Sequence, residues 1–260
     1  MTILDTINAY KYKEITAKKE AIPSKLLENS AYFNRETHSL KKSLKKNSIG
    51  IIAEHKRKSP SKSVINDRID LPNVIEGYTT HGASGISILT DTRFFGGSLT
   101  DLSLARTLTE LPILRKDFII DPYQIYEAKA FGADVILLIA ASLSRSKIKE
   151  LSGVAKTLHL EVLVEIHTES ELEKCLLDTV DIIGVNNRNL KTFEVTIDYS
   201  MQLATKIPTQ FMKISESGIS DPNTVKKLSK AGFQGYLMGE HFMKTTNPGS
   251  ALKTFISAIS

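Results

Sequence analysis

Charged and amide side chains stand where several short apolar runs of this chain end. The residues at or near such ends are Glu54, Lys56, Asp91, Lys116, Glu165, Asn186, Glu216 and Gly239. A charge at the end of a buried run costs several kcal/mol unless it has partners or a task. Carboxylates that converge with lysines shift one another's pKa, which is typical of sites that move protons. We therefore expect these residues to meet at one mouth, where the lysines and carboxylates among them could carry out general acid–base chemistry.

The apolar runs themselves recur at intervals of about two to three dozen residues, with stretches of helical spacing between them. The eight runs begin at Ile51, Ile86, Pro112, Val135, Glu161, Ile182, Phe211 and Gly235. Continuous apolar strands that alternate with helices indicate a parallel sheet covered on both faces. Eight such units in one domain predict an α/β fold, the (β/α)8 TIM barrel, whose chemistry lies at the carboxyl ends of the strands.

The third run shows how the strand period separates two kinds of side chain. Lys116 shares one face with Leu114 and Phe118, while Arg115 and Asp117 point to the other face. The first set is suited to a pocket with one ammonium group and an aromatic wall. The second set can pair with neighbouring helices.

The chain is expected to form a single domain overall in two parts. Residues 49–260 are predicted to be the catalytic barrel, and residues 1–48 an N-terminal helical extension of two or three helices, an appendage to the barrel. Pro23 breaks this extension, and Ser24 is the expected N-cap of the helix that follows.

Composition excludes several classes of protein. Of the 260 residues, 41% are hydrophobic, and Cys175 is the single cysteine, so neither a disulfide framework nor a thiolate zinc cluster is possible. The first residues lack an apolar core of signal-peptide length, and no run approaches the length of a membrane span. We expect a cytoplasmic protein without membrane association and, by default, a monomer.

A net charge of +5 allows affinity for anions or nucleic acid. Leu40 and Leu44 lie four residues apart within the lysine run from His38 to Ser48, which predicts a short amphipathic helix with a solvated lysine face. No zinc-finger spacing or aromatic RNA-binding strand accompanies it, so nucleic acid is not favoured. The histidines show no usable ligand spacing, and we expect no metal and most histidines at the surface or at helix ends.

The loops after the seventh and eighth runs predict a phosphate site. Ser217 and Gly218 follow one run, and Gly239 and Glu240 follow the other before a short helical segment. Barrels commonly bind phosphate at these two loops through backbone N–H groups.

Strings along nearly the whole chain resemble the indole-3-glycerol phosphate synthase family of tryptophan biosynthesis. They are IIAEHKRKSPSKS, LTDTRFFGGS, PILRKDFIID, GADVILLIA, VLVEIH, IGVNNRNL, SESGI and LMGEHFM. The resemblance implies a carboxy-lyase that acts on a sugar phosphate, 1-(2-carboxyphenylamino)-1-deoxyribulose 5-phosphate. It would form indole-3-glycerol phosphate with loss of carbon dioxide and water, without metal or cofactor. Since the sequence ends at Ser260, we expect the isomerase domain that is fused in some members to be absent.

The same resemblance implies roles for individual residues. Lys116 is similar to the general acid that protonates the ribulose carbonyl, and Glu165 to the carboxyl that assists dehydration, with Glu54 and Lys56 sharing acid and base duties. The implied substrate contacts are Lys56 and Arg188 for the carboxylate, Asn186 and Glu216 for hydroxyls and catalytic groups, Phe95 and Phe118 for the aromatic ring, and Ser59, Ser217, Gly218, Gly239 and Glu240 for the phosphate, with Ser217 counted also among the catalytic residues.

Two alternatives stay open. A class I aldolase-type barrel would use Lys116 as a Schiff-base lysine, which must lose its proton before it attacks a carbonyl. Nearby carboxylates favour the ammonium form instead. A non-catalytic anion-binding or RNA-binding barrel would depend on the run from Lys41 to Lys46, and its binding would weaken steeply with salt.

Overall fold

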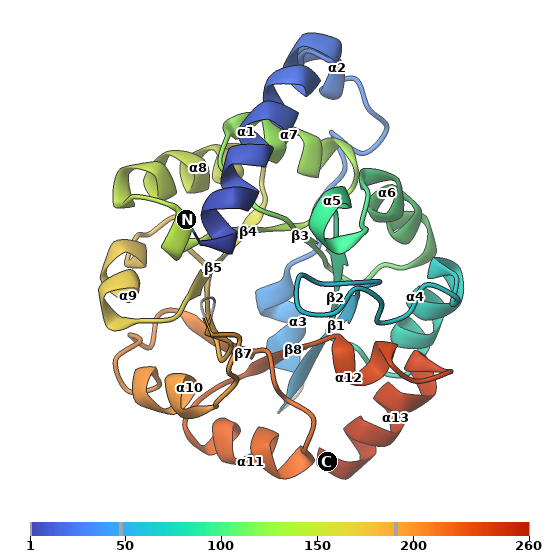
Figure 1. Ribbon diagram of the computed structural model, residues 1–260, viewed down its shortest axis with the longest axis vertical. Coiled ribbons are helices and arrows are strands. Elements are labelled where there is room, and N and C mark those ends of the chain that lie inside the picture. Colours follow the sequence, from blue (N-terminus) through green and yellow to red (C-terminus); the bar gives the residue numbers. More distant parts are fainter. Residues whose placement is uncertain (1, 47–48, 190–191, 260) are drawn as a thin grey trace.

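A computed structural model describes residues 2–46, 49–189 and 192–259. In these residues eight parallel strands close into a barrel in sequence order, and β1 pairs with β8 to complete it (Figure 1). The strands are β1 Gly50–His55, β2 Gly85–Leu89, β3 Ile113–Lys116, β4 Val135–Ile139, β5 Glu161–Ile166, β6 Ile182–Asn186, β7 Met212–Glu216 and β8 Gly235–Met238. The predicted (β/α)8 TIM barrel is confirmed.

Helices surround the barrel and connect one strand to the next (Figure 1). They are α4 Leu71–Thr80, α5 Thr92–Phe95, α6 Leu99–Leu108, α7 Pro122–Ala130, the 3-10 turn η1 Ala140–Ser142, α8 Arg145–Thr157, α9 Glu169–Cys175, α10 Asp198–Leu203, α11 Pro222–Lys230, α12 Glu240–Met243 and α13 Pro248–Ile259. None of the helices in the described part of the chain is long and apolar enough to cross a membrane.

The strands bury both of their faces, which is why their sequences are continuous apolar runs. Side chains on the outer faces, such as Ile51 and Ile86, pack beneath the helices. Side chains on the inner faces, such as Ile52, Leu114 and Leu163, form a second cluster inside the barrel. The barrel interior is therefore a packed core, and the pocket lies above it.

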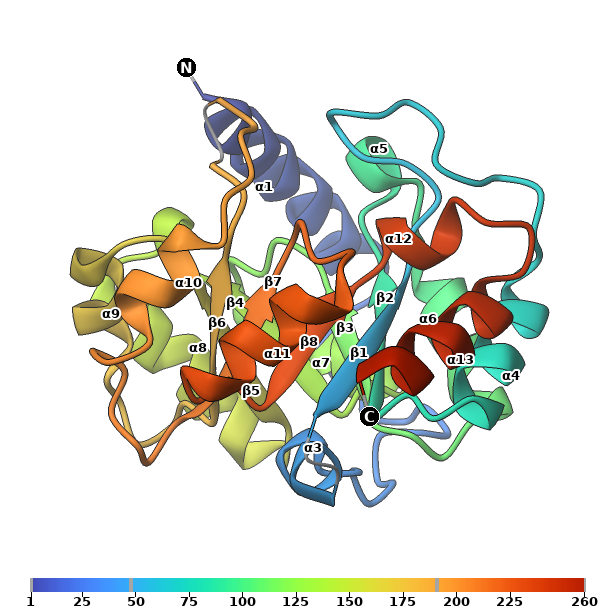
Figure 2. The same ribbon diagram turned by 90° about the horizontal axis from the view of Figure 1, so that it is seen from below.

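The segment before β1 contacts both ends of the barrel. Helix α3, Leu40–Lys46, lies where the strands begin, and α1, Ile3–Ala21, lies at the opposite end (Figure 2). Leu40 and Leu44 of α3 are fully buried in the inner cluster, and Lys45 and Lys46 are exposed as predicted. The expected domain boundary falls beside residues 47 and 48, which lie outside the described residues.

The short helix α2, Ser24–Leu27, does not begin as expected. Pro23 occupies the N-cap position, Ser24 is the first helical residue, and no side chain caps the helix. The predicted N-cap at Ser24 is therefore wrong. Pro23 fixes the extended backbone that the cap position needs, so the serine falls one residue too late.

Candidate active site

A pocket of about 340 Å³ opens at the carboxyl ends of the strands. It is lined by every residue to which the family resemblance gave a role: Glu54, Lys56, Ser59, Phe95, Lys116, Phe118, Glu165, Asn186, Arg188, Glu216, Ser217, Gly218, Gly239 and Glu240. The barrel brings them together because side chains at the carboxyl ends of parallel strands share one rim.

Asp91 is the exception among the strand-end residues, and its expected place at the mouth is wrong. Its carboxylate is fully buried, accepts hydrogen bonds from the N–H groups of Phe94 and Phe95, and forms an ion pair with Lys11. Asp91 lies beyond the end of β2 as the N-cap of α5, so it turns away from the pocket.

Glu54 and Lys56 form an ion pair at the end of β1. The Lys56 Nζ lies 2.8 Å from Glu54 Oε1, while Ser87 donates to the other carboxylate oxygen at 3.1 Å. Burial raises the pKa of Glu54, but the ammonium groups of Lys56 and Lys116 outweigh it and hold this pKa below its ordinary value. Glu54 is therefore a carboxylate at neutral pH and can accept a proton.

Lys116 lies between two buried carboxylates. Its Nζ is 3.1 Å from Glu165 Oε2 and 3.4 Å from Glu216 Oε2. Burial by itself would lower the pKa of Lys116, yet the charges of Glu165, Glu216 and Glu54 raise it well above its ordinary value. The group is held as an ammonium ion, which is the form that a general acid needs.

Glu216 differs from its two neighbours. Burial, with the nearby carboxylates of Glu165 and Glu54, raises its pKa to about 7 despite the charge of Lys116. By contrast Lys116, His167 and Asn186 hold the pKa of Glu165 below its ordinary value against the effect of burial. Neighbouring carboxylates thus favour different protonation states, which is a common arrangement in acid–base sites.

The Glu216 side chain extends over Gly184 of β6. A Cβ atom at this glycine would lie 2.2 Å from Glu216 Oε1, far inside van der Waals contact. Only glycine leaves room for the carboxylate in this position. No local pattern indicated this requirement, because nothing in one strand shows where a side chain of the next strand will lie.

Two phenylalanines form an aromatic wall of the pocket. The rings of Phe95 and Phe118 lie 5.9 Å apart between centroids, with their planes inclined by 39°. Arg115 and Asp117, on the opposite face of β3, pair with each other and with Glu127 of α7 or Lys11 of α1. The ion pairs follow the period-two separation predicted for this strand, although Asp117, just beyond its end, also lines the pocket.

The loops after β7 and β8 line another side of the pocket. Ser217 and Gly218 both adopt left-handed backbone conformations, with φ of 69° and 71°, and the Asn187 side chain donates to the Ser217 carbonyl. The Glu240 carboxylate forms an ion pair with Lys62 and lies 4.0 Å from the Arg188 guanidinium. Successive left-handed residues can direct neighbouring backbone N–H groups at an anion.

Three apolar residues of α1 were missed by the sequence reasoning. Ile3, Leu4 and Ile7 line the pocket, so this helix supplies part of the site. Their spacing, with Ile7 and Ile15 on one helical face, was a usable signal. The signal was weak, because the helix is mostly polar and Lys11 lies between Ile7 and Ile15 on that face.

The histidines mostly follow expectation, but His55 does not. Its side chain is buried on the outer face of β1, and burial, together with the charge of Arg57, lowers its pKa to about 4. His167 lies near Glu165, with its Nε2 3.9 Å from Glu165 Oε1. Among the described residues, no group of three or more histidine, cysteine, aspartate or glutamate side chains is arranged to hold a metal ion.

The fold and the pocket define a (β/α)8-barrel enzyme whose reactive groups are buried lysine–carboxylate pairs at the carboxyl ends of its strands. Over residues 4–255 the chain matches the family model described as indole-3-glycerol phosphate synthase. The chain therefore belongs to the indole-3-glycerol phosphate synthase family, as its sequence strings predicted, and the expectation of a lyase of tryptophan biosynthesis is confirmed with it.

Curated relatives agree over nearly the full length. The chain is 48% identical to indole-3-glycerol phosphate synthase of Bacteroides thetaiotaomicron, covering 99% of this chain and 98% of the relative. It is 43% identical to the enzyme of the same name from Salinibacter ruber, covering 97% and 94%.

Solved structures at low identity share the fold alone. KGPDC from Streptococcus mutans superposes with a TM-score of 0.59 at 16% identity, covering 81% of this chain and 97% of the other. Thiamine phosphate pyrophosphorylase from Pyrococcus furiosus gives 0.60 at 13% identity, covering 82% and 96%.

Proposed function

We propose that the protein converts 1-(2-carboxyphenylamino)-1-deoxyribulose 5-phosphate to indole-3-glycerol phosphate, carbon dioxide and water. The observation that carries this assignment is the ammonium group of Lys116, held between Glu165 and Glu216 in a pocket that also has an aromatic wall. Such a pocket can bind an aryl ring and protonate a carbonyl beside it. Family membership supplies the substrate.

The first step forms the new carbon–carbon bond. The ring carbon that carries the carboxylate attacks the ribulose carbonyl carbon, and Lys116 gives its proton to the carbonyl oxygen as the oxygen gains charge. The glutamates around Lys116 keep it protonated until this moment, and they stabilise the ammonium form to which it returns. Phe95 and Phe118 would hold the ring against the attacked carbon.

The second step releases carbon dioxide. The bond between the ring and its carboxylate breaks, and its electrons restore the aromatic ring. We propose that Lys56 and Arg188 hold this carboxylate, since both cations line the pocket and Lys56 is fixed by Glu54. Their charges orient the carboxylate before it leaves as a neutral molecule.

The third step removes water and completes the indole. The hydroxyl formed in the first step leaves with a proton from an acid of the pocket, and the ring system loses a proton to a carboxylate. Glu165 is proposed to assist this dehydration, with Glu54 and Lys56 sharing proton transfers. Asn186 and Glu216 would orient hydroxyls and catalytic groups.

The phosphate is proposed to lie against the loops after β7 and β8. The backbone at Ser217, Gly218, Gly239 and Glu240 would bind it, with Ser59 closing from the loop after β1. The left-handed conformations at Ser217 and Gly218 support this placement. We also propose that the protein acts as a monomer in the cytoplasm and needs no cofactor.

The aldolase alternative requires Lys116 to be neutral before it attacks a carbonyl. The carboxylates of Glu165, Glu216 and Glu54 hold Lys116 as an ammonium ion, and this charge state favours acid catalysis. The anion-binding alternative is not favoured either, because Lys45 and Lys46 lie on α3 where the strands begin (Figure 2). The pocket residues lie at the other ends of the strands.

Indole fluorescence tests the function directly. The chain contains no tryptophan, so an indole signal that rises on addition of the substrate comes from product alone. Wild-type protein should give this signal and release carbon dioxide in equal amount. A folded protein that gives neither would refute the proposal, and borohydride trapping of a substrate adduct on Lys116 would favour the aldolase instead.

A further inference from the structure

Lys11 lies on α1, one helical turn after the pocket residue Ile7, and therefore on the same face of the helix. A lysine is rarely buried without several partners. Its side chain is only 1% exposed. The burial of this charged group therefore needs a physical reason. Nothing in the sequence pattern had given Lys11 a part in the site.

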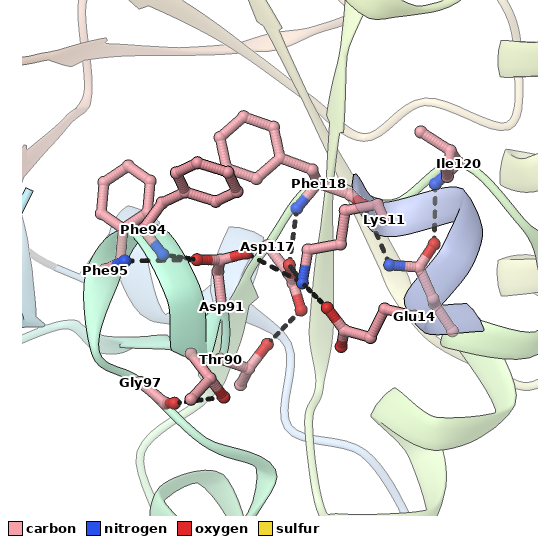
Figure 3. Close-up of polar contacts among 12 residues, drawn as sticks. Lys11, Glu14, Thr90, Asp91, Phe94, Phe95, Gly97, Asp117, Phe118 and Ile120 are labelled. Atoms are coloured by element: carbon pink, nitrogen blue, oxygen red, sulfur yellow. Dashed lines mark hydrogen bonds and ion pairs between the residues drawn. The ribbon is translucent and has the colours of Figure 1, made fainter. Parts of the chain in front are cut away.

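Three carboxylates surround the Lys11 ammonium group (Figure 3). Its Nζ lies 2.9 Å from Asp117 Oδ1, 3.0 Å from Asp91 Oδ2 and 3.1 Å from Glu14 Oε2. Burial would lower the pKa of Lys11, yet Asp117, Asp91 and Glu14 raise it well above its ordinary value. The group is a permanent cation that joins α1 to the ends of two neighbouring strands.

The two aspartates hold the backbone of the aromatic wall. Asp91 Oδ1 accepts from the N–H of Phe95 at 3.2 Å and from that of Phe94 at 2.6 Å. Asp117 Oδ1, the same oxygen that binds Lys11, accepts from the N–H of Phe118 at 2.8 Å. Figure 3 shows Phe95 and Phe118 beside this network, each tied through one carboxylate to the same cation.

Without Lys11 the two carboxylates would be left in unequal surroundings. Asp117 would keep Arg115, whose guanidinium lies 3.0 Å from its other oxygen. Asp91 has no second ion-pair partner among residues 2–46, 49–189 and 192–259. A buried carboxylate without a cation must take up a proton or move toward water. Either change would loosen the cap that fixes Phe95.

We propose that Lys11 is a positioning residue for the aromatic ring of the substrate, because it holds Asp91 and Asp117 and thereby sets the gap between Phe95 and Phe118. This inference rests on the proposed function, in which these two rings flank the substrate ring. Lys11 touches neither the substrate nor a reacting atom. It acts through the backbone of the residues that do.

The test compares two lysines of α1. Lys11→Met removes the buried cation and keeps a side chain of similar length. Lys19→Met is the matched control, because Lys19 also joins α1 to the barrel, through an ion pair of 2.7 Å with Asp121, but contacts neither aspartate of the network. Turnover is followed by indole fluorescence, and folding by circular dichroism.

We expect Lys11→Met to raise KM by about tenfold or more, with a smaller effect on kcat, because a ring misplaced by about 1 Å loses binding and alignment. Anthranilate, the ring fragment of the substrate, should lose inhibition in parallel. Inorganic phosphate should inhibit the wild type and Lys11→Met equally, since the loops proposed to bind phosphate are not part of this network. Lys19→Met should leave all three values within about twofold.

Three outcomes would overturn the inference. One is an unchanged KM in folded Lys11→Met. Another is an equal loss of anthranilate and phosphate inhibition, which would mean general damage to the pocket. The third is the same change in Lys19→Met, which would mean that docking of α1 alone matters.

If Lys11→Met does not fold, the double variant Lys11→Met, Asp91→Asn replaces it. This variant removes one buried charge of each sign and keeps the oxygen that caps α5, but it still removes the ammonium group that joins Asp91 to Asp117. Because the two rings are then no longer tied to one cation, the same loss specific to the ring is expected, and the same results would overturn the inference. The proposed function can fail separately. If wild-type protein forms no indole-3-glycerol phosphate, anthranilate binding measured by calorimetry on the same variants still decides the role of Lys11.

Discussion

Lys116 Nζ and Glu165 Oε2 lie 3.1 Å apart, so the proposed proton donor and the carboxyl proposed for dehydration form one ion pair. Each partner stabilises the charged form of the other. When Lys116 loses its proton, it no longer lowers the pKa of Glu165, and Glu165 then takes up a proton more readily. The pair can couple the first step of the proposed reaction to the last.

Replacement of Lys116 by alanine should abolish most turnover. We expect kcat to fall by about two to four orders of magnitude, the usual range for loss of a general acid, while the fold is retained. Lys46→Ala is the control, since Lys46 is exposed on α3. Stopped assays of indole formation measure both variants, and near-normal turnover in Lys116→Ala would remove this residue from the mechanism.

Gly184→Ala should damage activity although glycine and alanine differ by one methyl group. The new Cβ would lie 2.2 Å from Glu216 Oε1, so the carboxylate must leave its place beside Lys116. We expect kcat to fall by about two orders of magnitude. Gly153→Ala in α8 has no atom within 4 Å of the added Cβ and should keep full activity. Equal activity in the two variants would show that the Glu216 position does not matter.

His55 should make stability depend on pH. Its pKa is about 4 in the folded protein and about 6.5 in the unfolded chain, so between these values the unfolded state binds more protons. Stability contributed by neutral His55 is therefore present above pH 6.5 and is lost as pH falls toward 4. By pH 5 the loss should be about 2 kcal/mol.

Urea unfolding at pH 7.5 and pH 5 measures this effect. The His55→Gln variant cannot titrate at this position, so its free energy of unfolding should fall less than that of the wild type over the same interval. Subtracting the fall in unfolding free energy of the variant from that of the wild type isolates the contribution of His55 from that of other titrating groups. Parallel behaviour of the two proteins would contradict the depressed pKa.

The contact between α3 and the inner cluster predicts a large loss of stability on truncation. Leu44 is fully buried at the start of the strands, so Leu44→Ala should lower the free energy of unfolding by about 2–5 kcal/mol. Leu26→Ala is the control, because Leu26 is 57% exposed. Thermal unfolding measures both, and similar midpoints would mean that α3 does not support the barrel. Activity at low temperature should remain, since α3 is far from the pocket.

The barrel could be predicted from sequence because buried parallel strands leave continuous apolar runs. Strand-end residues such as Lys116 and Glu165 followed from the same pattern. Asp91 did not, since the pattern gives the end of a strand but not the residue at which the chain turns to cap a helix. The roles proposed for individual residues still await the measurements above.

The part played by α1 lay beyond the sequence for a different reason. Lys11 is one of many lysines, and its three carboxylate partners come from its own helix and from the segments just after β2 and β3. Only the folded chain brings them together. A polar residue that becomes buried through tertiary ion pairs has no local signature.

The two leucines of α3 have a consequence for the order of events in turnover. Leu40 and Leu44 fill the inner cluster where the strands begin, and the other side chains of that cluster pack the space above them. No route through the barrel axis remains in the part of the chain that the structure describes. Substrate and indole-3-glycerol phosphate must therefore both pass through the end of the barrel where the strands finish, so the next substrate can bind only after the product has left.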